Sequence, residues 1–158
     1  TYFSFRTSML EIYQRLSSST GLDIYGEVEL CHLQREKGRF KTAIFTGEEV
    51  GFFLERGNVL KVGDALISRC GRALLVTAKK EDVVRASTDD WSQFSKACYH
   101  LGNRHVKIQI GEKWLRILPD HVLEEMLIGL NMALKHEKAA FVPEQGAYKH
   151  VKNHERII

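Results

Sequence analysis

Short runs of alternating apolar and polar residues fill the first half of the chain, from Leu10 to about Ser87. Each run is rich in Val, Ile, Phe and Tyr and is bounded by glycine-containing turns, which is typical of strands that bury one face. The predicted strands are LEIYQ, YGEVELC, FKTAIF, VGFFLE, ALISR and ALLVTA. Turn residues also predict two hairpins, one around TGEE and one around SRCGRALLV. We therefore expect a small sheet or a pair of sheets in this half.

Helical periodicity begins after a further strand-like run, EDVVRAS. Apolar residues recur at helical spacing from Trp91 to Leu101, after capping residues at 88–90, and Gly102 stands where a left-handed C-cap glycine is expected. The runs HVKIQI and KWLRIL then predict a hairpin whose first strand opens at His105.

A second helix is predicted from Asp120 to Asn131, followed by a last strand, MALKH. Its apolar face is expected to consist of Val122, Leu123, Met126, Leu127 and Leu130. The order β-α-β-β-α-β over residues 81–136 is that of a ferredoxin-like fold, in which two helices cover one face of a four-stranded sheet. The predicted class is therefore α+β.

The change of pattern near AKKED predicts two domains and a tail. We expect a β-rich domain over residues 9–78, a ferredoxin-like domain over residues 79–140 and a flexible tail over residues 141–158. No apolar period is found beyond Glu137, so order is expected to fade there. Residues 1–8 precede the first clear pattern and are left out of the fold prediction.

The composition excludes several classes of protein. With 44% hydrophobic and 27% charged residues, disorder is excluded as the main state. A formal net charge of +3 is too small for the dense basic surface of a nucleic-acid-binding protein, so no nucleic-acid partner is expected. No apolar run is long enough to span a membrane, and three cysteines without a CxxC pair favour a reducing compartment. The prediction is a cytoplasmic protein without a membrane partner.

Catalytic motifs are not found in the sequence. There is no HExxH, no GxSxG, no P-loop and no glycine-rich nucleotide fingerprint, so an enzyme is not expected. Asp120 and Glu124 lie one helical turn apart, but a capping aspartate followed by an exposed acid explains them more simply. A zinc-dependent hydrolase is disfavoured because no pair of carboxylates converges with histidines.

His105 is the most informative residue for chemistry, because it stands between a predicted helix end and a predicted strand. Strand alternation places Val106, Ile108 and Ile110 inward and His105 on the opposite face, held by rigid elements but open to an ion or partner. His100, near the end of the first helix, is a candidate support for His105. An exposed histidine without function is the alternative interpretation.

The remaining candidates are His121, His150 and His154. The last two are four residues apart in the tail, a spacing that puts both imidazoles on one face of a helical turn, where they can chelate a divalent ion. His121 follows the predicted N-cap Asp120, and a helix N-terminus favours the neutral, ligand-competent imidazole. Two incidental histidines in a solvated tail remain the alternative for the pair, and His32 and His136 are assigned no role.

The segment SKACYHLGNRHVKIQIGEKWLRILPDHVLEEMLIGL, from Ser95 to Leu130, closely resembles the signature segment of the UreE urease accessory proteins, which are nickel metallochaperones. The GNRH at residues 102–105 is its most specific part. EVGFFLERGNVLKVGDAL and FVPEQGAY are similar to two other segments of that family and occur in the same order. By this resemblance the chain is identified as a member of the family.

The resemblance implies a homodimer in which His105 of each subunit binds one shared Ni²⁺ ion, with His150 and His154 completing the coordination. It implies a nickel donor to apo-urease that acts with other urease accessory proteins, including the GTPase accessory protein, and that carries out no catalysis. Cu²⁺ and Zn²⁺ are expected to bind the same imidazoles in vitro. Pro119 stands where some members have the first histidine of a His-Asp-His sequence, which leaves only His121 of a second metal site. The alternative function is a peptide-binding co-chaperone for apo-urease assembly in which metal binding is incidental.

Overall fold

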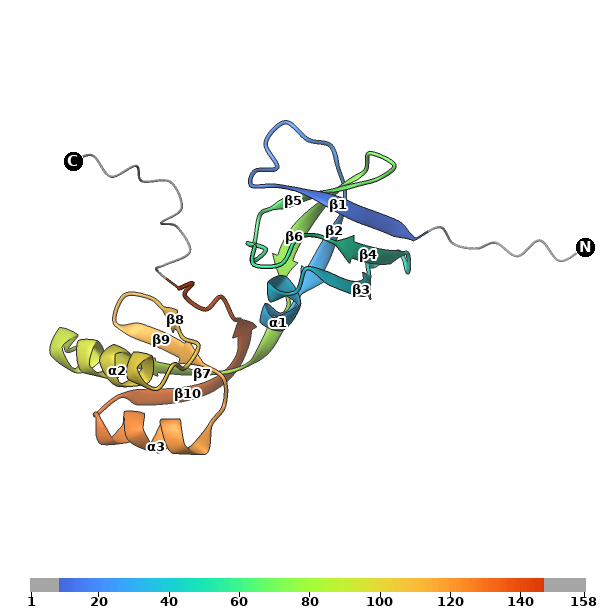
Figure 1. Ribbon diagram of the computed structural model, residues 1–158. Helices are drawn as coiled ribbons and strands as arrows, with labels where there is room; N and C mark the ends of the chain where they lie inside the picture. Colours follow the sequence, from blue (N-terminus) through green and yellow to red (C-terminus); the bar gives the residue numbers. More distant parts are fainter. Residues whose placement is uncertain (1–8, 147–158) are drawn as a thin grey trace, which may run out of the picture. The chain divides into compact units, whose positions relative to one another are not determined.

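A computed structural model describes residues 9–146 of the chain (Figure 1). The chain divides into two compact units, Thr1–Lys80 and Glu81–Ile158. The first unit is built around a β-sheet and the second around a sheet with helices. The α+β class predicted from the sequence is confirmed.

The first unit contains one six-stranded sheet in the order β2-β6-β5-β1-β4-β3. Its strands are β1 (Leu10–Leu16), β2 (Ile24–Leu30), β3 (Arg39–Ala43), β4 (Glu49–Phe53), β5 (Ala65–Ser68) and β6 (Ala73–Ala78). The two predicted hairpins are confirmed, because β3 pairs antiparallel with β4 and β5 with β6. Two further pairs, β1 with β4 and β2 with β6, are parallel.

Alternate residues of these strands form one apolar core. The most deeply buried side chains are Ile12, Val28, Leu30, Val50, Phe52, Leu66, Leu74 and Val76. A short helix, α1 (His32–Glu36), interrupts the strands and was not predicted. Five residues are too few for a helical period to be recognised in sequence.

The second unit has the predicted ferredoxin-like order. Its elements are β7 (Lys80–Ser87), α2 (Trp91–Asn103), β8 (Gln109–Ile110), β9 (Trp114–Ile117), α3 (His121–Gly129) and β10 (Ala133–Ala140), and the sheet order is β10-β7-β9-β8. The predicted N-caps are confirmed, since the carboxylates of Asp90 and Asp120 accept backbone N–H groups of Ser92 and Leu123.

Both helices of the second unit pack against the same face of the sheet. Val84 lies opposite Ile117 and Ala86 opposite Leu115 on neighbouring antiparallel strands, and all four are fully buried. The helix residues in the same cluster are Phe94, Ala97, Leu101, Leu123 and Leu127. This core fixes the directions of α2 and α3, and with them the positions of the residues at the helix ends.

The end of α2 differs from the prediction in two respects. Gly102 does not adopt a positive φ, and the helix continues to Asn103; the left-handed residue is His105, with φ 56°. The strand expected to open at His105 is confined to Gln109–Ile110, and Ile110 is 41% exposed instead of buried. The reason is that residues 104–106 end the helix in a hydrogen-bonded turn before the chain enters the sheet.

Two residues expected on apolar helix faces are exposed. Trp91 is 50% exposed and Val122 is 59% exposed. Both lie in the first turn of their helices, where side chains lean back toward the helix N-terminus, past the packed region.

The last strand is longer than predicted. The expectation that order fades at Glu137 is wrong, because β10 extends to Ala140. Beyond it Phe141 is fully buried, and the N–H of Glu144 donates to the carbonyl of Ile108 at 2.7 Å. Residues 147–158 lie outside the described part of the chain.

Candidate metal-binding site

His105 occupies the left-handed position of a Schellman motif at the C-terminus of α2. The N–H of Val106 donates to the carbonyl of Leu101 at 3.2 Å, and the N–H of His105 donates to the carbonyl of Gly102 at 3.0 Å. These are the two hydrogen bonds that define the motif, with Arg104 as the C-cap residue. Glycine or asparagine is usual at this position, because at positive φ the Cβ of other residues lies too close to the following carbonyl oxygen.

The apolar contact that accompanies this motif is present on the core side. Leu101 is fully buried, and Val106 is half-buried against the same cluster. His105 itself is exposed. The backbone at this point is thus anchored in the core while the imidazole remains accessible to solvent.

The second helix ends in the same way. Asn131 has φ 59°, its N–H donates to the carbonyl of Ile128 at 2.9 Å, and the N–H of Met132 donates to that of Leu127 at 3.0 Å. The prediction that Asn131 ends this helix is confirmed. Both motifs can be recognised in the sequence, because each helix end lies between two apolar residues that are five positions apart. These pairs are Leu101 with Val106 and Leu127 with Met132.

His100 is exposed near the end of α2. Its ring packs edge-on against Tyr99, with 5.3 Å between the ring centroids. Within the described residues, no contact between His100 and His105 is found. The support for His105 comes from the backbone motif instead.

His121 is the first residue of α3, as predicted. Its side chain is 89% exposed, and its Nε2 lies 3.2 Å from Oε1 of Glu125, one turn along the helix. The adjacent Asp120 caps the helix through the N–H of Leu123 at 3.0 Å. The Glu125 carboxylate can accept a hydrogen bond from the imidazole. The ring is therefore close to a negative carboxylate as well as to the partial positive charge of the helix N-terminus.

His136 makes a side-chain contact with Glu124 that the sequence does not predict. His136, on β10, pairs through Nε2 with Glu124 Oε1, and Glu124 Oε2 accepts the N–H of Asp120 at 3.2 Å. Glu124 thus joins the start of α3 to β10 and has a structural role. No pattern in the sequence indicates this pair, because it depends on how a helix packs beside a strand.

The described residues do not by themselves form a complete metal site. Within residues 9–146, no three His, Cys, Asp or Glu side chains lie close enough together to bind one ion. His150 and His154 lie outside the described residues. His105 and His121 are therefore the exposed candidate ligands whose positions are known.

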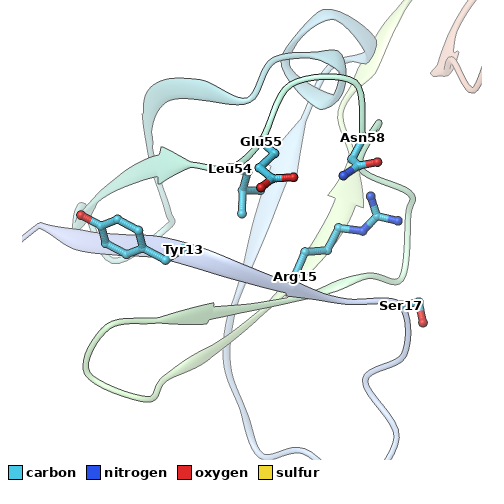
Figure 2. A pocket seen from close by; sticks show the side chains of 6 residues that line it. All are labelled: Tyr13, Arg15, Ser17, Leu54, Glu55 and Asn58. Carbon is cyan, nitrogen blue, oxygen red and sulfur yellow. The ribbon is translucent and has the colours of Figure 1, made fainter.

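The first unit has a cavity of about 410 Å³, shown in Figure 2. It is lined by Tyr13, Arg15, Ser17, Leu54, Glu55 and Asn58. Arg15 extends from β1 toward Asn58, while its Nε pairs with buried Asp64 at 3.0 Å and its Nη1 donates to the carbonyl of Val59 at 3.1 Å. Tyr13 stacks on Phe53 with a centroid distance of 5.1 Å. The wall is mostly polar, and it is suited to hydrogen bonding with a peptide or side chain.

Two family models together match almost the whole described chain. Residues 15–79 match the N-terminal domain of the UreE urease accessory protein, and residues 81–156 match its C-terminal domain. The chain belongs to the UreE urease accessory protein family. His105, His121, His150 and His154 all fall within the match to the UreE C-terminal domain.

Relatives agree with this assignment over nearly their full length. A urease accessory protein UreE from Marinomonas sp. is 56% identical over 92% of this chain and 99% of its own. The UreE of Alteromonas mediterranea is 49% identical over 89% of this chain and 90% of its own, and that of Psychromonas ingrahamii is 44% identical over 89% and 91%. The UreE family is named for an accessory role rather than for a catalysed reaction. In the described part of the chain, no helix has the length and apolar character needed to cross a membrane.

Proposed function

We propose that this UreE-family chain binds Ni²⁺ at His105 and donates it during assembly of the urease metallocentre, without catalysing a reaction. The observation that carries the proposal is the placement of His105: an exposed imidazole on a backbone that is anchored in the core. Imidazole is a good ligand for nickel, copper and zinc, so the donor chemistry fits the cargo.

Nickel bound at His105 needs further ligands, which we assign to a second copy of the chain and to the tail. In a two-fold homodimer one His105 from each subunit can meet at the axis, so that symmetry doubles the ligand set. His150 and His154 complete the coordination or exchange with solvent. A site assembled in this way is open, which suits a donor that must release its ion, whereas a closed four-ligand site is typical of structural metals.

His121 is assigned to a weaker, peripheral site. Its imidazole is exposed and has one carboxylate, that of Glu125, within reach. Two side chains one turn apart are a poor chelate compared with a shared dimer site. Loss of His121 is therefore expected to affect the loosely bound metal only.

The two units are assigned separate roles in this proposal. Residues 9–78 engage apo-urease and other urease accessory proteins, including the GTPase accessory protein. Residues 79–140 bind metal and dimerise, and residues 141–158 carry the tail histidines. The protein acts in the cytoplasm, and Cu²⁺ or Zn²⁺ binds the same imidazoles in vitro.

Native mass spectrometry with isothermal titration calorimetry tests the proposal. The full chain should appear as a dimer with nickel bound, and His105→Ala should lose the tight nickel while remaining dimeric and folded. His100→Ala is the matched control, because it removes an exposed histidine from α2, the helix that ends just before His105, and should leave nickel affinity unchanged. Unchanged nickel binding by His105→Ala would reject the proposal. Affinity should also fall on acidification, because protons compete for the imidazole nitrogen.

The cavity beside β1 favours a second candidate function, binding of a peptide of apo-urease as a co-chaperone. Its polar wall, with the stacked ring of Tyr13 at one end, offers hydrogen bonds and an aromatic contact. If this is the main activity, Tyr13→Ala should impair urease activation while nickel affinity is unchanged, and His105→Ala should leave activation intact. The nickel-donor proposal expects the opposite result for His105→Ala.

A further inference from the structure

At the C-terminus of α2, a candidate metal ligand has a backbone conformation that is unfavourable for residues with a Cβ. His105 has φ 56°, and a residue with a Cβ adopts this conformation only where the surrounding structure enforces it. The enforcing contacts are the hydrogen bonds from His105 to Gly102 and from Val106 to Leu101, together with the packing of Val106 against the core.

We propose that Val106 is the positioning residue for nickel binding at His105. It acts through the backbone: its apolar side chain packs against the core cluster that includes Leu101, and its N–H donates the outer hydrogen bond of the motif. This inference rests on the proposed function, because it assigns to the same site the element that orients its ligand.

The backbone geometry explains how Val106, although only half-buried, can affect metal binding at His105. If the packing of Val106 against this core cluster is weakened, the outer hydrogen bond opens and His105 can relax to a right-handed φ. Its Cα–Cβ bond then points in a different direction, and the imidazole no longer approaches the ion along the same line. In a site shared by two copies, both ligands are displaced together.

The strained position also bears on release of the ion. A ligand held by a short anchored segment is available without ordering a flexible chain, which lowers the entropic cost of binding. When the anchor is weakened, each dissociation event is assisted by fraying of the helix end. The effect of a Val106 variant is therefore expected mainly in the rate of nickel dissociation.

The test compares Val106→Ala with Val106→Ile in the full-length dimer. Val106→Ala should weaken nickel affinity about tenfold, the lower end of the effect of losing a group that orients a metal ligand. Dissociation into a chelator should be correspondingly faster, and the amides of His105 and Val106 should exchange with solvent more rapidly. Val106→Ile keeps an apolar side chain at this position, so its nickel affinity should be near that of the parent chain.

Met132→Ala is the control for general destabilisation. Met132 occupies the corresponding position in the Schellman motif of α3, where the left-handed residue is Asn131. It should lower thermal stability while leaving nickel affinity unchanged. If Val106→Ala does not fold, Val106→Thr, which has the same shape and a more polar side chain, takes its place.

The results separate this inference from the proposed function. Faster amide exchange at His105 with unchanged nickel affinity in Val106→Ala would overturn the positioning role, as would equal losses of affinity in Val106→Ala and Met132→Ala. If His105→Ala still binds nickel tightly, the proposed function itself fails, and this result does not depend on the Val106 variants.

Discussion

His105 and Asn131 occupy equivalent backbone positions at the ends of the two helices of the second unit. Their φ angles are 56° and 59°, and each follows a C-cap residue in a motif closed by the same pair of hydrogen bonds. Glycine is the usual residue at this position, and asparagine is found there less often. Glycine would fit the backbone at position 105 better, so local stability alone does not account for the histidine there.

Replacement of His105 by glycine should therefore stabilise the fold and abolish tight nickel binding. Relief of the left-handed strain, reduced by the greater entropy of glycine in the unfolded chain, is expected to add about 1 kcal/mol to the free energy of unfolding. Urea denaturation followed by tryptophan fluorescence measures it, because both tryptophans, Trp91 and Trp114, lie in the second unit.

His105→Ala is the control that separates strain from ligation. It removes the imidazole but keeps a Cβ at positive φ, so nickel binding should be lost without the gain in stability. Asn131→Gly should give a smaller gain than His105→Gly and should leave nickel binding unchanged. A His105→Gly variant no more stable than His105→Ala would contradict the argument from strain.

The strands and the ferredoxin-like order could be predicted because they follow from local periodicity. Alternation identifies residues such as Ile12 and Val50 as buried, and helical spacing identifies Phe94 and Leu101. The parallel pairing of β1 with β4 could not be predicted, because it joins segments that are distant in sequence and leaves no local pattern.

The exposed position of His105 after a helix could be predicted from the sequence, but its conformation could not. Glycine is the usual left-handed residue at a helix end, so the sequence favours Gly102 for that position. Leu101 and Val106 instead both pack in the core cluster, and the left-handed residue between them is His105. The link from His136 to Glu124 had no sequence pattern at all.

The pair of Arg15 and Asp64 should be a sensitive polar contact in the first unit. Asp64 is 2% exposed and also accepts the N–H of Lys61 at 2.8 Å. Asp64→Ala leaves the guanidinium of Arg15 without its partner, and we expect a loss of about 3 kcal/mol, the lower end for a broken buried pair, because the arginine is partly solvated. Thermal unfolding followed by circular dichroism measures this loss. Asp82→Ala is the control, since its pair with Lys138 spans 3.8 Å at the surface and should contribute less than about 0.5 kcal/mol.

Tyr25 and Glu48 should make stability depend on pH in the acidic range. The Tyr25 hydroxyl donates to the Glu48 carboxylate, and this hydrogen bond lowers the pKa of Glu48 below its ordinary value of 4.5. A group whose pKa is lowered by folding contributes stability above its unfolded-state pKa and loses that contribution as the pH falls through the folded-state pKa. Tyr25→Phe should therefore lower the melting temperature at pH 7 more than at pH 3.

Carboxyl NMR should show the pKa of Glu48 rising in Tyr25→Phe. The control is Tyr13→Phe, because the Tyr13 ring stacks on Phe53 and no bond from its hydroxyl to a carboxylate is found in the described residues. Equal losses of melting temperature at both pH values in Tyr25→Phe would argue against an electrostatic role for the pair.

The cysteines should differ in reactivity toward iodoacetamide, with Cys70 reacting before Cys98. A hydrogen bond with the Ser68 hydroxyl, at 3.1 Å, lowers the pKa of the exposed Cys70 thiol, and the backbone N–H of Arg72 adds to the effect. Burial raises the pKa of the half-buried Cys98 thiol. Because the thiolate is the reacting species, Cys70 should be alkylated first at neutral pH, as measured by peptide mass spectrometry. Ser68→Ala should slow the alkylation of Cys70 and leave that of Cys98 unchanged, whereas Ser95→Ala should change neither. An unaltered Cys70 rate in Ser68→Ala would mean that exposure alone sets the reactivity of this thiol.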